Sequence, residues 1–110
     1  MSFLIDLALS AFAGIFFAFS ALISPVCQGS LLAGQYSVWF GNPANKKSRA
    51  DFTVRKSEDN GQTWSHSKLV SATPGCGYSS LQFLDSNEST VGFLWEADSQ
   101  CTIRFAPVTL

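Results

Sequence analysis

The octet Ser57–Trp64, SEDNGQTW, sets two carboxylates beside a turn and a tryptophan. Adjacent carboxylates are a residue type that general acid–base catalysis uses, so Glu58 and Asp59 are the first candidates for chemistry. The same letters also describe a tight hairpin, because Asn60-Gly61 tolerates positive φ angles. The octet therefore has a catalytic and a structural interpretation, and the two must be weighed against each other.

The structural interpretation accounts for more of the octet. Ser57 and Asp59 can direct their side chains at turn amides and lock the loop, and Trp64 can fold back over the turn and bury its ring. None of this requires a substrate. We therefore predict that Ser57, Asp59, Gly61 and Trp64 form a scaffold, and keep direct catalysis by Asp59 or Glu58 as the lesser alternative.

Metal and redox chemistry have little support in the sequence. The three cysteines, Cys27, Cys76 and Cys101, lack CxxC spacing, and the single His66 cannot complete a zinc site. We predict no metal and no cofactor. An odd number of cysteines leaves one unpaired, and the sequence does not show which two, if any, form a disulfide.

The N-terminal segment has a different composition from the rest of the chain. Asp6 is the only charged residue among residues 3–23, and the first basic residue is Lys46. The 17 residues from Leu7 to Ile23 carry no charge, a length at the border between a signal-peptide core and a membrane-spanning helix. We predict a signal peptide or membrane-anchor helix at residues 1–24, with a misassigned start as the third alternative. This implies the secretory pathway, with a membrane-associated, extracellular or lysosomal destination, and a membrane partner through residues 3–23.

The chain after Ser24-Pro25 reads as short strands separated by turns. The whole sequence, with 110 residues and a net charge of -1, has room for one small domain and shows no sign of a nucleic-acid surface. Strands about ten residues apart indicate an antiparallel meander rather than βαβ units, so we predict an all-β fold. The expected strands are Gly29–Leu32, Tyr36–Phe40, Asp51–Lys56, Lys68–Ser71, Ser80–Leu84, Val91–Glu96 and Thr102–Val108.

The pattern S-x-D-x-G-x-T-W in the octet resembles the Asp box of sialidases and other β-propellers. The stretches PVCQGSLL, FGNPANKKSRADFTVRKS, GYSSLQFL, VGFLWEA and IRFAPVTL resemble, in the same order, the C-terminal part of exo-α-sialidase catalytic domains. The resemblance covers nearly everything after the apolar segment. It implies that residues 25–110 form a partial sialidase-type propeller of about one and a half to two blades. The implied function is release of terminal sialic acid from glycoconjugates with retention of configuration.

The resemblance also implies roles for three residues that would otherwise be a surface arginine, a loop aromatic and a strand-end carboxylate. Arg49, in SRADF, matches an arginine that clamps the substrate carboxylate, a task that suits its planar fork. Tyr78, in GYSS, matches the nucleophile that attacks the anomeric carbon. Glu96, in LWEA, matches a glutamate that orients another arginine of the family's triad.

Several groups that the family uses have no counterpart in the sequence. These are the glutamate that activates the tyrosine, two further arginines, the aspartate acid/base and the FRIP-type motif. Because such groups act as a unit, we predict that the chain alone is inactive. We expect a truncated gene, with a degenerate relative or a piece that completes another chain as alternatives. The competing functions are a non-catalytic glycan-binding module and a structural propeller remnant, secreted or membrane-tethered.

Overall fold

The computed structural model describes residues 22–110. Across them the chain forms strands joined by turns and irregular segments, and each pair of neighbouring strands is antiparallel. The predicted all-β fold is confirmed. The strands are β1 (Ser30–Ala33), β2 (Val38–Pro43), β3 (Phe52–Ser57), β4 (His66–Ser71), β5 (Ser79–Phe83), β6 (Thr90–Glu96) and β7 (Ile103–Thr109).

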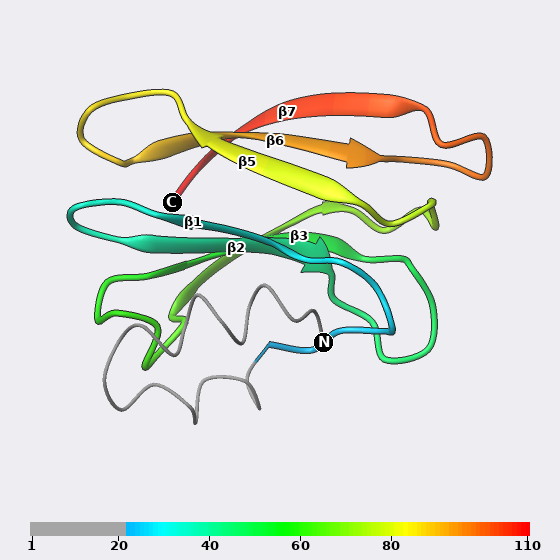
Figure 1. Cartoon of the computed structure of the whole chain (residues 1–110), viewed down its shortest axis with the longest axis horizontal. Coiled ribbons are helices and arrows are strands. Elements are labelled where there is room, and N and C mark those ends of the chain that lie inside the picture. Colours follow the sequence, from blue (N-terminus) through cyan, green and yellow to red (C-terminus); the bar gives the residue numbers. More distant parts are fainter. Residues whose placement is uncertain (1–21) are drawn as a thin grey trace.

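The strands form two sheets in meander order. The first sheet is β1-β2-β3-β4 and the second is β5-β6-β7. The second sheet lies across the first, with β5 against β1 and β2 (Figure 1). In each sheet the strand order follows the chain order, as the predicted antiparallel meander requires.

The predicted N-terminal helix falls almost wholly outside the described residues. Its last three positions, residues 22–24, are described and are not helical. In the described part of the chain, no helix is long and apolar enough to cross a membrane.

Each strand begins or ends at least one residue away from its predicted bounds, and two of these differences have a clear structural cause. Gly41–Pro43 was predicted as part of a break but continues β2, because it pairs with Phe52–Val54 of β3. Pro43 is the last residue of β2, and it is tolerated because β1 pairs with β2 only from Val38 to Gly41, which leaves Pro43 at an unpaired edge on that side. His66, which lies outside the expected strand Lys68–Ser71, is exposed but opens β4 opposite Lys56. In both places the pairing of a neighbouring strand overrides the local turn signal.

The core lies between the two sheets and consists of alternating residues from facing strands. In β6, Phe93 and Trp95 point toward the first sheet and stack with ring centroids 5.4 Å apart. Trp39 of β2 and Phe52 of β3 are fully buried opposite them. Full burial of such a side chain stabilises the fold by about 1.5–3 kcal/mol. This packing fixes the two sheets relative to each other, and therefore the loops at their ends.

Candidate active site

Arg49, Tyr78 and Glu96 come together at one end of the stacked sheets. Arg49 lies in the connection between β2 and β3, Tyr78 directly precedes β5, and Glu96 ends β6. The Arg49 guanidinium carbon lies 5.9 Å from the centre of the Tyr78 ring. The Tyr78 amide donates a hydrogen bond of 3.0 Å to Glu96 Oε1. The three residues that the resemblance singled out are therefore neighbours.

Arg49 is exposed, and main-chain carbonyl groups hold it in place. Its Nη1 donates to the Cys76 carbonyl oxygen at 2.7 Å, and its Nη2 donates to the Val26 carbonyl oxygen at 3.2 Å. A guanidinium has five N–H donors, so these two bonds leave others for a ligand. A positioned guanidinium with donors to spare can bind a carboxylate.

Gly77 permits this position of Arg49. Its φ angle is +110°, in a region that L side chains rarely adopt. A Cβ at this position would lie 2.6 Å from Arg49 Cδ and 2.7 Å from Cys27 Sγ. The Arg49 side chain and the Cys27 thiol therefore pack directly on the backbone of Gly77, and only glycine leaves room for both.

The Tyr78 side chain is open to solvent, with 54% of the residue exposed. The main chain of Tyr78 makes two hydrogen bonds to Glu96. Its amide donates to the Glu96 carboxylate, and its carbonyl oxygen accepts the Glu96 amide at 3.0 Å. Within residues 22–110 the phenol makes no hydrogen bond to another protein group. A tyrosine nucleophile needs a base to remove its proton, and the described residues hold none against the hydroxyl.

Glu96 is half-buried and has a different partner from the one its predicted role requires. Its carboxylate accepts the Tyr78 amide, and in the part of the chain that the structure describes it forms no ion pair with an arginine. The role of orienting an arginine stays a prediction. In residues 22–110 Glu96 instead fixes the main chain at Tyr78.

A shallow depression of about 260 Å³ lies beside Tyr78. It is mainly apolar, and Trp95 and Glu96 are among the residues that line it. The residues that line it are Tyr78, Ser79, Ser80, Leu94, Trp95, Glu96 and Ile103. A ligand held by Arg49 would therefore have apolar surface close by.

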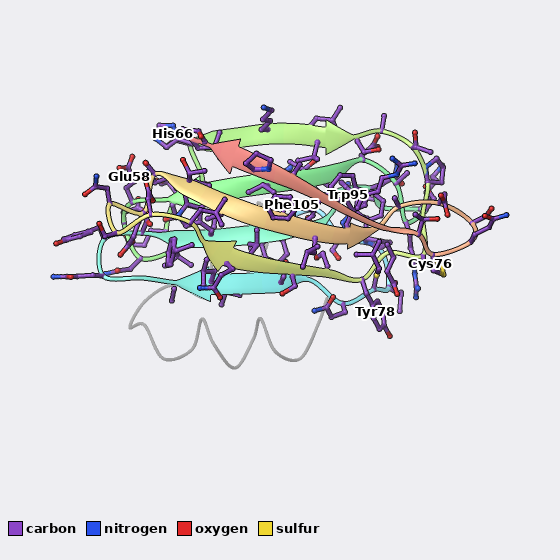
Figure 2. All side chains as sticks on the ribbon, turned by 90° about the horizontal axis from the view of Figure 1, so that it is seen from above. Glu58, His66, Cys76, Tyr78, Trp95 and Phe105 are labelled. Atoms are coloured by element: carbon purple, nitrogen blue, oxygen red, sulfur yellow. A yellow bond between two sulfur atoms is a disulfide. The ribbon has the colours of Figure 1, made fainter. Side chains whose placement is uncertain are left out.

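The octet lies at the opposite end of the sheets from Tyr78, as the labelled Glu58 and Tyr78 show in Figure 2. The Ser57 hydroxyl donates to Asp59 Oδ1 at 2.7 Å and accepts the Gly61 amide at 2.8 Å. Asn60 and Gly61 have φ angles of 61° and 86°. The octet is thus the predicted turn, and its carboxylates lie far from the candidate site.

Asp59 is the centre of this turn. Its carboxylate accepts the Thr63 amide at 2.8 Å and the Thr63 hydroxyl at 2.5 Å, and these bonds lower the pKa of Asp59 below its ordinary value. The ring of the half-buried Trp64 packs edge to face on the Phe40 ring, with the two ring centroids 6.3 Å apart. These contacts agree with the structural interpretation, while assignment of the turn as an Asp box stays a prediction.

The same aspartate device recurs in two other hairpins, which the sequence reasoning missed. Asp85 binds the amide and hydroxyl of Ser89, and Asp98 binds those of Thr102. In all three turns a Ser or Thr stands four residues after the Asp. The spacing D-x-x-x-[ST] between two strands could have revealed them.

Glu88 is a further residue that sequence reasoning missed. It is 6% exposed and reaches from the β5–β6 turn to the β1–β2 turn of the other sheet. Its carboxylate accepts the Gln35 amide at 2.6 Å, the Tyr36 amide at 3.0 Å and the Ser37 hydroxyl at 2.7 Å. Burial opposes ionisation of Glu88, but these hydrogen bonds outweigh burial and lower its pKa.

The cysteines resolve into one disulfide and one thiol. Cys76 and Cys101 are bonded, and Cys27 is a buried free thiol. Burial raises the pKa of Cys27, although Arg49 opposes the shift. Among the described residues, no group of three or more His, Cys, Asp or Glu could hold a metal ion.

Comparisons with known proteins point to sialidases. No family model matches the chain. A sialidase of Bacteroides fragilis (strain YCH46) is 34% identical over 87 residues, covering 70% of this chain and 16% of that protein. The solved structure of Hadza microbial sialidase Hz136 is 35% identical with a TM-score of 0.72, covering 81% of this chain and 18% of that one. The chain has a sialidase-like fold and spans less than a fifth of the length of either protein.

Proposed function

We propose that residues 25–110 are the C-terminal part of an exo-α-sialidase, a retaining glycoside hydrolase that releases terminal sialic acid from glycoconjugates. The observation that carries the proposal is the convergence of Arg49, Tyr78 and Glu96 on one end of the two sheets. Their types fit the reaction: a guanidinium for the sugar carboxylate, a phenol for the anomeric carbon, and a carboxylate that fixes the main chain at the phenol.

The chemistry assigns a distinct task to each group. Arg49 binds the carboxylate of sialic acid and orients the anomeric carbon toward Tyr78. The phenol oxygen attacks that carbon, the aglycone departs, and water later hydrolyses the glycosyl-tyrosine. A phenol suits this substrate because an anionic nucleophile would be repelled by the adjacent sugar carboxylate. We expect the base for Tyr78 to come from protein outside this chain, and the chain alone to be inactive.

The exposed apolar face of the second sheet supports a place within a larger protein. Leu94, Ile103 and Phe105 are 43%, 62% and 56% exposed on that face. Soluble proteins seldom leave such a group of large apolar side chains uncovered. In the proposed arrangement the two sheets are blades of a propeller, with the Ser57–Trp64 turn as its Asp box, and further protein covers the face.

A chimera tests the proposal. Residues 25–110 would replace the matching segment of Hadza microbial sialidase Hz136, and hydrolysis of a fluorogenic sialoside would be measured. We expect turnover that Tyr78→Phe abolishes, because the phenol oxygen is the nucleophile. Tyr36→Phe is the matched control, because Tyr36 is 64% exposed in the β1–β2 turn at the opposite end of the sheets.

The outcomes separate the enzyme proposal from its alternatives. The Tyr36→Phe chimera should keep the turnover of the parent chimera, and the 110-residue chain by itself should show none. Turnover that survives Tyr78→Phe would remove Tyr78 from the mechanism. A chimera that folds, by circular dichroism and melting, yet lacks activity would contradict the enzyme proposal.

A non-catalytic glycan-binding module is the second candidate, favoured by the exposed Arg49 guanidinium near Tyr78, which lines the depression together with Trp95. Sialic acid would be titrated into the full chain while tryptophan fluorescence is followed. Saturable quenching that is lost in Arg49→Ala and kept in Arg104→Ala would support binding at Arg49. Arg104→Ala is the matched control, because it also removes one arginine. Quenching that persists in Arg49→Ala would contradict it.

The secretory assignment of the chain is also a proposal. The Cys76–Cys101 disulfide supports it, because disulfides persist in oxidising compartments and are rare in the cytosol. We propose that residues 1–24 direct the chain into the secretory pathway, where sialylated glycoconjugates would be its partners. Fractionation of cells that express the full chain, with and without residues 1–24, tests this assignment.

A further inference from the structure

The Cys76–Cys101 disulfide lies at the same end of the molecule as Tyr78 (Figure 2). It joins the segment before β5 to the turn between β6 and β7, across 25 residues of sequence. Cys76 stands two residues before Tyr78. The disulfide is therefore a covalent link between the candidate site and a turn that the proposed chemistry does not use.

The segment Gly75–Tyr78 is the common partner of the other two site residues. The Gly75 amide donates to the Arg49 carbonyl at 2.9 Å, and the Cys76 carbonyl accepts Arg49 Nη1 at 2.7 Å. The Cys76 amide donates to the Glu96 carbonyl at 3.1 Å, and the Tyr78 amide donates to the Glu96 carboxylate. A displacement of this segment would therefore move Tyr78 and loosen both Arg49 and Glu96.

This segment has little intrinsic rigidity. It lies outside any strand until Ser79, and glycines flank Cys76 on both sides. Gly75 and Gly77 have more conformational freedom than any other residue type, so confining them costs more entropy. Hydrogen bonds alone must offset that cost unless a covalent link restricts the segment.

The turn at the other end of the disulfide is well held. Asp98 Oδ1 accepts the Gln100 and Thr102 amides at 3.0 Å and 3.2 Å, and the Cys101 amide donates to the Asp98 carbonyl at 2.9 Å. The Ala97 amide donates to the Thr102 carbonyl at 2.8 Å. Cys101 is thus fixed to the end of β6, directly beyond Glu96.

We propose that the Cys76–Cys101 disulfide is a redox-sensitive positioning device for the site. The intact bond holds the Cys76 carbonyl on Arg49 and the Tyr78 amide on Glu96, and its reduction releases both. Reduction requires an external dithiol, which supplies two electrons and two protons. The S–S bond breaks, two thiols form, and the dithiol closes to its own disulfide. The roles of Arg49 and Tyr78 rest on the proposed function, but their geometry does not.

Cys27 does not compete in this exchange at neutral pH. It is the one further cysteine of the sequence, and its thiol packs against the Cβ position of Gly77, next to Cys76. Burial raises its pKa, so the thiol stays protonated, and the thiolate is the form that attacks disulfides. A Cys27→Ala background removes any remaining exchange from the experiment.

Amide hydrogen exchange measured by NMR tests the proposal on the full chain carrying Cys27→Ala. The Tyr78 amide reports the site end, and the Thr63 amide, bonded to Asp59, reports the opposite end. On reduction we expect Tyr78 to exchange at least about tenfold faster, while Thr63 changes by less than about twofold. The ring-current shift of the Arg49 Cδ protons should shrink as the guanidinium leaves the Tyr78 ring.

Each alternative result overturns the proposal. Unchanged exchange at Tyr78 would show that the hydrogen bonds suffice without the disulfide, and equal acceleration at Tyr78 and Thr63 would make it a general stabiliser only. The double variant Cys76→Ser/Cys101→Ser should reproduce the reduced state without reductant, and circular dichroism checks its fold. The readout uses no sugar, so an inactive chimera would contradict the proposed function and leave this test intact.

Discussion

The Ser57–Trp64 turn and the Tyr78 site, at opposite ends of the stacked sheets, differ in the sequence distance that their hydrogen bonds span. At the β3–β4 turn the bonds of Ser57 and Asp59 join residues two to four positions apart. At the Tyr78 end, Glu96 reaches across 18 positions and Arg49 across 27. A local turn can form wherever its own residues are present, whereas the Tyr78 end forms only when both sheets have packed. The candidate site thus depends on the whole fold, and the octet does not.

Glycine substitutions give the largest expected difference between the two ends. Gly77→Ala must adopt a φ of +110° and drive its Cβ into Arg49 and Cys27, so we expect a loss of roughly 2–4 kcal/mol in the free energy of unfolding. Gly61→Ala must adopt a φ of +86° within the octet turn, and we expect a loss of about 1 kcal/mol. Urea unfolding of both variants measures the two losses.

The exchange rate of the Tyr78 amide sharpens this comparison. Gly77→Ala should accelerate it while Gly61→Ala should not, because only the first variant disturbs the segment that binds Glu96. Equal losses of stability in the two variants would contradict the distinction between the ends. They would mean that Arg49 and Cys27 yield to the new methyl group without cost.

The same distinction explains what the sequence could predict. The octet was predicted from its own letters, because every bond in it is local and Asn60-Gly61 has a known backbone preference. Nothing local marks Arg49 as the neighbour of Tyr78, so these residues could be singled out only through the resemblance to sialidases. Strand boundaries at Gly41–Pro43 and His66 were missed for a related reason, since pairing with β3 decides them.

Glu88 lay beyond sequence reasoning altogether. In DSNEST it reads as one more solvated charge in a polar loop, or as the middle of a glycosylation tripeptide. In the structure its carboxylate is buried and accepts hydrogen bonds from amides more than fifty positions away in sequence. Polar composition predicts a loop, but not which distant donors the loop will meet.

Glu88→Gln is the second prediction, because this carboxylate makes long-range bonds at the same end of the sheets as the locally bonded octet. Both carboxylate oxygens of Glu88 accept hydrogen bonds. Glutamine replaces one of these oxygens with an NH₂ group, which cannot accept them. We expect a melting temperature below wild type at pH 7, with a smaller loss than Gly77→Ala causes. Thermal melts followed by circular dichroism measure the effect.

The pH dependence of this effect has a defined sign. The pKa of Glu88 is lower in the folded chain, so its contribution is present above the unfolded pKa of about 4.3 and is lost as pH falls through the folded pKa. The stability difference between wild type and Glu88→Gln should therefore shrink below about pH 4. A constant difference from pH 7 to pH 3 would show that shape, rather than charge, holds the β1–β2 turn.

Glu58→Gln should have the smallest effect, although Glu58 belongs to the octet and its carboxylate lies near both His66 and Lys56. His66 Nε2 lies 2.8 Å from Glu58 Oε1 and Lys56 Nζ lies 4.0 Å from Oε2, but the Glu58 side chain is 60% exposed. Water screens such pairs, so we expect a change within about 0.5 kcal/mol in urea unfolding at pH 7. A loss above about 1 kcal/mol would mean that surface charge, and not the Asp59 turn, stabilises this end. Hydrogen exchange of the Thr63 amide in Glu58→Gln decides between these explanations, because it stays as slow as in wild type only if the bonds to Asp59 persist.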